Sequence, residues 1–391
     1  MLNKKDGSTK CWEIKRGRDE MYKIGFIGGG VNSAIGRSHY IAAQMDGKFQ
    51  LVAGAFSRKT DINKKTGEEF LVAPERVYDD YHTLLENEKG KLDVIAILTP
   101  TDTHEKIVME CLAAGYPVIC EKSLSTSYDS ACRIRKCVEE KQGFLCVTYN
   151  YTGYPMVRVL RDKISKGELG KITNIIVEMP QEGYTRYTLE HKEPKPQDWR
   201  MVDYEIPTIS LDLGTHLHNM MAFLTGAKPR EIVARESSFG FFPQVIDDVL
   251  CMINYTDDIA AQMWFSKAAL GNRNGLRIRV FGTKASAEWY QVEPETLKVH
   301  DKNGQIYLLD RSNDKGEGEQ ARYNRFKVGH PSGFIEAYAN YYWDIYDALT
   351  EYFTKGKEAS HYLMNIDTSM EGLKMFEAAH KSAELHQWVD V

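Results

Sequence analysis

The chain has 391 residues, of which 42% are hydrophobic and 27% charged, a balance typical of globular proteins and unlike that of disordered or fibrous chains. This length predicts two domains, because a single core rarely grows beyond roughly 250–300 residues. The net charge of −5 gives no concentrated basic surface of the kind that nucleic acids and acidic membranes require. We therefore expect a small-molecule partner, and neither a nucleic acid nor a membrane.

The cysteines indicate a reducing compartment. There are seven of them, an odd number, and they form no paired CxxC motifs. No segment resembles a signal peptide or a membrane span, so we expect a cytoplasmic protein. Residues 1–21 are polar and lack periodicity, which predicts an extension outside the core.

From Tyr22 onward, apolar strand-like runs alternate with segments of helical spacing. This alternation predicts a parallel sheet with helices on both faces, a doubly wound Rossmann α/β domain over residues 22–150. Strands are expected at 22–30, 49–56, 93–100, 117–122 and 144–150, and helices at 38–45, 61–70, 104–114 and 127–141.

The alternation breaks near Asn150, where we place the domain boundary. Strands are then expected at 172–179, 248–255, 259–266, 276–282 and 285–292, and helices at 155–166, 333–353 and 368–386. Consecutive strands joined by short turns favour an open, mostly antiparallel sheet. The sequence thus predicts a second, α+β domain over residues 151–391, which we expect to bind substrate and to mediate oligomerisation.

A glycine-rich turn follows the first strand. Gly28, Gly30 and Gly36 would let the backbone turn tightly and expose amides of a helix N-terminus to a pyrophosphate. Their spacing, Gly-x-Gly-x5-Gly, is longer than the usual G-x-G-x-x-G, so an ordinary glycine-rich turn is the alternative. A dinucleotide site is the interpretation that the position after the first strand favours.

The second strand ends at Ser57-Arg58-Lys59, where an enzyme that prefers NAD usually has an acidic residue for the ribose. This basic tip could accept the 2′-phosphate of NADP, or both cations could simply be solvated. The expected cofactor is NAD, with NADP left open.

Lys122 ends another buried strand, at the same sheet edge as the glycine turn. An ammonium there could stabilise an alkoxide, although a lysine after a strand can also be an ordinary surface residue. Asp212 and His216 lie four residues apart, so on a helix the carboxylate could orient the imidazole as a proton acceptor. The alternative is a capping aspartate beside a packed histidine. A metal site made of Asp212, His216 and His218 is a further alternative. The sequence has no HExxH motif or cysteine cluster to support it, so we expect no metal.

Together these motifs resemble the glucose-fructose oxidoreductase/inositol dehydrogenase (Gfo/Idh/MocA) family. The resemblance runs from Tyr22 to the C-terminus and rests on the Gly28–Gly36 turn, Thr99-Pro100 with His104, Glu121-Lys122 and Asp212-x-Gly214-x-His216. The segments GGGVNSAIG, LVAGAFS, YNYTGYPMVR, GNRNGLRIRVFG and GHPSGFIEAYANYY are most similar to the levoglucosan dehydrogenase branch, whose relatives oxidise the sugar 3-hydroxyl.

This resemblance implies a catalytic set of Lys122, Asp212 and His216. It implies that a sugar would contact these three residues and also Tyr154, Gln181, Trp199 and Arg200. An aromatic platform beside hydrogen-bonding groups suits a pyranose, although Trp199 could instead be core and Arg200 a surface ion pair. The cofactor contacts implied are Gly28, Gly30, Ser33, Ala34, Ile35, Ser57, Arg58, Thr99, Thr101, His104, Glu121, Lys122 and Asn150. A homodimer or homotetramer is also implied.

Two features depart from the family pattern. Ser123 follows Lys122 where the family commonly has proline, and residues 183–208 form a long segment rich in proline and charge. The second departure predicts a modified rim over the substrate.

The expected reaction is oxidation of the 3-hydroxyl of a glucose-like pyranoside, such as levoglucosan or an O- or C-glycoside, to a 3-keto sugar. His216 would accept the hydroxyl proton, Lys122 would polarise the oxygen and Asp212 would orient His216. Two alternatives remain. One is an NAD-dependent glycoside hydrolase that uses transient 3-oxidation, and the other is a non-catalytic, nucleotide-sensing regulator.

Overall fold

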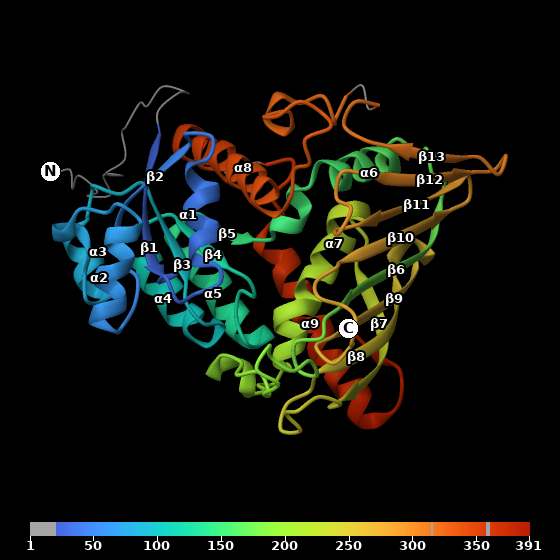
Figure 1. The fold of residues 1–391 in the computed structure, drawn as a ribbon, viewed down its shortest axis with the longest axis horizontal. Coiled ribbons are helices and arrows are strands. Elements are labelled where there is room, and N and C mark those ends of the chain that lie inside the picture. The colour runs from blue at the N-terminus through green and yellow to red at the C-terminus, as the bar shows by residue number, and fades with distance from the viewer. Residues whose placement is uncertain (1–20, 314–315, 357–359) are drawn as a thin grey trace, which may run out of the picture.

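A computed structural model of the chain describes residues 21–313, 316–356 and 360–391, so the expected N-terminal extension lies outside the described residues apart from Met21. Figure 1 shows two sheets, one on each side of the molecule, with helices between them. Among the described residues, no helix is both long enough and apolar enough to cross a membrane.

The first sheet has five parallel strands in the order β2-β1-β3-β4-β5. They are β1 (Tyr22–Gly28), β2 (Phe49–Ala55), β3 (Val94–Leu98), β4 (Val118–Glu121) and β5 (Leu145–Thr148). The three strands from β3 to β5 are buried at every position, which is why they read as continuous apolar runs. The doubly wound parallel sheet is confirmed, and its winding reverses between β1 and β3, where such folds bind ligands.

The helices in this part of the chain are α1 (Gly36–Gln44), α2 (Thr60–Glu69), α3 (Tyr81–Asn87), α4 (His104–Ala113) and α5 (Tyr128–Lys141). Helix α3 was not expected, because its seven residues are too few to show a periodic pattern. The carboxylate of Asp80 caps it by accepting a 2.9 Å hydrogen bond from the amide of Thr83.

The second sheet has nine strands in the order β13-β12-β11-β10-β6-β9-β8-β7-β14. Only the pair β6 and β9 is parallel, so the expected mostly antiparallel sheet is confirmed. The strands are β6 (Ile172–Pro180), β7 (Pro229–Ser237), β8 (Asp248–Tyr255), β9 (Ala260–Ser266), β10 (Arg277–Gly282), β11 (Ala285–Tyr290), β12 (Leu297–Asp301), β13 (Ile306–Leu309) and β14 (Val389–Asp390). Strands β7, β12, β13 and β14 were missed because they are short or lack a clear apolar alternation.

Helices α6 (Pro155–Ser165), α7 (Thr215–Thr225) and α9 (Ile366–Leu385) cover the inner face of this sheet (Figure 1). Its opposite face has no helix in the figure. Apolar side chains on it are partly exposed, including Met252 at 53%, Leu250 at 41% and Phe281 at 38%.

Helix α8 (Phe334–Lys355) belongs by sequence to the second domain but packs against the first sheet. The hydroxyl of Tyr341 donates to the carbonyl of Val147 on β5 at 2.7 Å, and the hydroxyl of Tyr342 lies 2.6 Å from Nδ1 of His39 on α1. The C-terminal part of the chain therefore completes the core of the N-terminal part.

Candidate active site

The turn after β1 is shaped by glycines that no other residue could replace without movement. Gly28 and Gly29 have φ angles of +83° and +72°. A Cβ at Gly28 would lie 2.8 Å from the carbonyl oxygen of Leu98, and one at Gly36 would lie 1.9 Å from that of Gly29. The turn is thus pressed against the end of β3, at the point where the sheet reverses its winding.

This turn has the features of a dinucleotide cradle. Helix α1 starts directly after it without a side-chain cap and with no acidic residue in its first turn, so its amides and positive dipole are open to an anion. Just after β5, at the same edge of the sheet, Nδ2 of Asn150 is buried without a hydrogen-bond partner. A nicotinamide dinucleotide fits a site of this kind. Its pyrophosphate supplies an anion for the N-terminus of α1, and its oxygen atoms can accept a hydrogen bond from Nδ2 of Asn150.

The other expected cofactor residues also lie at the carboxyl edge of the parallel sheet, since each follows a strand. They are Ser33, Ala34 and Ile35 after β1, Ser57 and Arg58 after β2, and Thr99 and Thr101 after β3. His104 differs from these, because its ring is fully buried with its nitrogens 2.8 Å and 2.9 Å from the carbonyls of Ser123 and Thr99. It joins the ends of β3 and β4 and cannot face a ligand directly.

Glu121, at the end of β4, also points into the core. Its carboxylate accepts hydrogen bonds from the hydroxyls of Thr148 and Tyr338 and lies 2.9 Å from Nε2 of His39. Burial alone would raise the pKa of Glu121, but the hydrogen bond and charge of His39, aided by the charge of Lys122, lower that pKa to about 2. Glu121 therefore anchors the strand from which Lys122 projects.

Lys122 reaches across to the second domain. Its Nζ donates to Oδ1 of Asp212 at 2.9 Å and to the backbone carbonyl of Asp212 at 2.6 Å. Asp212 lies in a π-helical turn, Ser210–Gly214, that leads directly into α7. Ninety residues apart in sequence, these two groups meet in the space between the two sheets.

Asp212 has two further cationic partners. Nζ of Lys267 lies 2.8 Å from Oδ2 of Asp212, and Nε of Arg200 donates to the same oxygen at 3.2 Å. Burial would raise the pKa of Asp212, but the charges of Lys122, Lys267 and Arg200 hold it well below its usual range. Lys267 was not identified from the sequence. Its only signal was a position just after an apolar strand, which many surface lysines share.

His216 does not make the contact that was expected of it. Among the described residues, the Asp212 carboxylate is bound by cations, while Nδ1 of His216 is buried without a partner. The proposed orientation of His216 by a hydrogen bond to Asp212 is therefore corrected. The reason is that the π-helical turn replaces the assumed α-helical spacing and the cations occupy both carboxylate oxygens.

The His216 ring is instead held by aromatic packing, edge-on to Tyr151 with centroids 4.7 Å apart. Burial, followed by the charge of Lys122, lowers the pKa of His216 to about 3. The imidazole is therefore neutral near pH 7, the form that can accept a proton.

The expected sugar-binding residues are only partly brought together. The Arg200 guanidinium stacks 4.5 Å from the ring centroid of Trp199, both side chains are partly exposed, and Arg200 contacts Asp212. Gln181 donates from Nε2 to Asn274 at 3.0 Å. Tyr154 is 2% exposed and packs against Trp289, so its ring belongs to the core.

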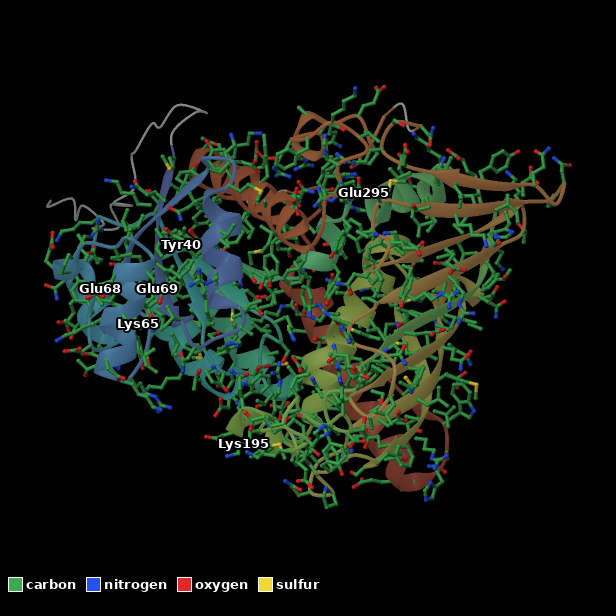
Figure 2. All side chains as sticks on the ribbon, viewed as in Figure 1. Tyr40, Lys65, Glu68, Glu69, Lys195 and Glu295 are labelled. Carbon is green, nitrogen blue, oxygen red and sulfur yellow. The ribbon has the colours of Figure 1, made fainter. Side chains whose placement is uncertain are left out.

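Residues 183–208, expected as a modified rim, carry Arg200 to the site. The segment is tied to the second sheet, because the amide of Tyr184 donates to the carbonyl of Lys267 at 2.8 Å and the Asp203 carboxylate accepts from the amide of Ile246 at 2.8 Å. Figure 2 shows Lys195 of this segment at the molecular surface, in the lower part of the view.

Comparison with protein families matches both parts of the chain. Residues 22–149 match a model described as an oxidoreductase family with an NAD-binding Rossmann fold, and residues 157–288 match the GFO/IDH/MocA C-terminal domain. These matches confirm the family resemblance and the NAD-binding Rossmann fold.

The chain is 32% identical over 387 residues to the Bacillus subtilis oxidoreductase YfiI, covering 93% of this chain and 95% of that one. A solved inositol dehydrogenase homologue from Azotobacter vinelandii, in complex with NADH and myo-inositol, superimposes with a TM-score of 0.84 at 26% identity, covering 95% and 98% of the two chains. Levoglucosan dehydrogenase of Pseudarthrobacter phenanthrenivorans is 22% identical over 304 residues, 71% of this chain and 75% of that enzyme.

Proposed function

Because the chain belongs to the GFO/IDH/MocA family of NAD-binding oxidoreductases, we propose that it oxidises the 3-hydroxyl of a glucose-like pyranoside, such as levoglucosan or an O- or C-glycoside, to a 3-keto sugar. The observation that carries this proposal is the pairing of Lys122 with Asp212. This pair joins the ligand-binding edge of the first sheet to the turn before α7 in the second domain. A substrate held there would lie beside the cofactor loop.

The site residues divide the work of removing a proton and a hydride from a secondary alcohol. An ammonium has three N–H donors, and Lys122 gives two of them to Asp212, which leaves one for the substrate oxygen. His216 accepts the hydroxyl proton as a neutral imidazole, and the C–O bond becomes a carbonyl as the C–H bond breaks. Bound NAD supplies the hydride acceptor. Asp212 fixes the position of Lys122.

Trp199 and Arg200 support a carbohydrate as the substrate. A planar aromatic group beside a guanidinium offers an apolar surface and several donors, which match the apolar face and the hydroxyls of a pyranose. The solved relative with myo-inositol bound supports a cyclic polyol as the substrate class.

The test is a reduction screen with NAD and NADP across levoglucosan, glucose, inositols and plant glycosides. We expect stoichiometric NADH and a keto sugar from at least one pyranoside. Free aglycone without net NADH would favour the NAD-dependent hydrolase. Failure to turn over any carbohydrate, together with cofactor-dependent binding of a protein partner, would favour the nucleotide-sensing regulator.

We also propose that the open face of the second sheet forms the contact of a homodimer or homotetramer. Partly exposed apolar residues alternate with buried ones along β8, so this face carries an apolar stripe that a second copy would cover. Met252→Lys should shift the mass measured by light scattering toward the monomer, and an unchanged mass would contradict the proposal.

A further inference from the structure

The site contains a second buried lysine that the hydride-transfer roles above do not require. The side chain of Lys267 is 8% exposed, and its Nζ lies 2.8 Å from Oδ2 of Asp212. Its ammonium also lies over the Tyr184 ring, 5.6 Å from the centroid. Asp212 is the only hydrogen-bond acceptor that the described residues provide for Nζ, so two N–H donors of a buried cation are left for a ligand.

The charges around Asp212 do not balance. Lys122, Lys267 and Arg200 all contact this one carboxylate, and His216 is neutral. Glu121 is a further carboxylate near Lys122, but it is engaged by His39, Thr148 and Tyr338. Among the charged groups in direct contact with Asp212, three cations therefore face one carboxylate. Burying an unpaired charge is costly, so a site of this kind favours an anionic ligand.

The nicotinamide end of the cofactor does not offset these cations, because the oxidised ring is itself cationic, and the negative pyrophosphate is placed at the glycine turn. A neutral sugar would leave the charge uncompensated as well. A negative group on the substrate would complement these cations.

We propose, on the basis of the function proposed above, that the pyranoside carries an oxyanion, a carboxylate or a phosphate, which Lys267 and Arg200 bind. The two lysines contact opposite oxygens of Asp212, so this carboxylate separates two parts of the site. The reacting hydroxyl binds beside Lys122, and the anionic substituent binds beside Lys267. A single pyranose with a charged exocyclic group can cover both parts.

The test compares matched substrates with the wild-type enzyme: methyl glucoside, methyl glucuronide and methyl glucoside 6-phosphate, each with NAD and with NADP. We expect kcat/KM to be at least about tenfold higher for one of the two anionic sugars than for the neutral one, the value of one additional ionic contact of about 1.4 kcal/mol. The two anionic sugars distinguish a carboxylate from a phosphate.

The variant Lys267→Met should bring the ratio of anionic to neutral kcat/KM toward one, and Lys267→Arg, which keeps the charge, should retain more of the ratio. The matched control is Lys171→Met, because Lys171 is an exposed lysine paired with Asp258 at 2.8 Å. It should leave the ratio unchanged.

Two outcomes would overturn the inference while leaving the proposed function intact. They are turnover without a preference for either anion, and a preference that Lys267→Met does not alter. Absence of turnover with every carbohydrate in the wider screen would instead refute the proposed function itself.

Discussion

Nζ of Lys122 donates hydrogen bonds to both the side-chain Oδ1 and the backbone carbonyl of Asp212, at 2.9 Å and 2.6 Å. Lys122 follows β4 of the first sheet and Asp212 lies in the π-helical turn before α7, so the site exists only when both parts of the chain are folded and packed together. The double contact also fixes the direction of the lysine, because two of its three donors are committed.

Replacing Lys122 with alanine should lower kcat by about 10²–10⁴-fold, the range found when a group that stabilises charge or transfers a proton is removed. Binding of NADH should change little, because the glycine turn and the N-terminus of α1 lie outside this substitution. Steady-state kinetics and NADH fluorescence titration measure the two effects. Unchanged turnover in purified Lys122→Ala would remove Lys122 from the catalytic set.

Asp212→Asn should destabilise the protein as well as inactivate it. The substitution removes the anion that three cations share, and breaking a buried ion pair from one side costs about 3–5 kcal/mol. Urea unfolding followed by circular dichroism should show this loss. Asp258→Asn is the control, since its ion pair with Lys171 is on the surface, where solvent screens it, and should contribute little to stability. Equal losses in the two variants would contradict the buried network.

Sequence patterns predicted those parts of the protein whose signal is local. The apolar strands, the glycine turn and the lysine at the end of β4 follow from periodicity and position along the chain. The cation cluster on Asp212 could not be predicted, because Lys122 and Lys267 lie far from Asp212 in sequence and only the fold brings them to it. The assumed contact between Asp212 and His216 failed because a π-helical turn cannot be recognised from spacing alone.

The packing partner of helix α8 also could not be predicted from the sequence. This helix lies within the second domain in sequence and was expected to pack there, yet its tyrosines contact β5 and α1 of the first domain. Amphipathic spacing predicts that a helix has a buried face, but it does not say which sheet covers that face.

Gly36→Ala should disrupt the cofactor turn. Its added Cβ would lie 1.9 Å from the carbonyl oxygen of Gly29, so the turn must move, at a cost of about 1–3 kcal/mol for an overpacked site. We expect weaker NADH binding and a lower melting temperature. Gly183→Ala is the matched control, because its Cβ would meet no atom within 4 Å. If both variants bind NADH as the wild type does, the turn is not the cofactor cradle.

Arg58→Ala tests which nicotinamide cofactor the enzyme prefers. Arg58 is exposed just after β2, where a 2′-phosphate would bind. If this residue accepts that phosphate, KM for NADP should rise about tenfold, the value of one charge-assisted hydrogen bond, and KM for NAD should rise much less. Equal changes in KM for the two cofactors would show that Arg58 does not bind the 2′-phosphate.

The stability of the protein should fall in mild acid, and His218 should account for part of that fall. Its ring is buried between α7 and α9, with Nε2 donating to the carbonyl of Thr368 at 3.1 Å, and burial lowers its pKa from 6.5 to about 4. Between pH 6.5 and about pH 4 the unfolded chain therefore binds more protons than the folded protein. The stabilisation is complete above pH 6.5 and is lost as the pH falls toward 4.

Between neutral pH and about pH 5 this histidine should contribute a loss of about 2 kcal/mol in the free energy of unfolding. His218→Asn removes the titrating group, so the variant should start less stable but lose about 2 kcal/mol less over the same interval. Urea denaturation at the two pH values measures both quantities. An equal loss in the variant and the wild type would assign the acid sensitivity to other groups, of which His216, with its pKa of about 3, is the next to test.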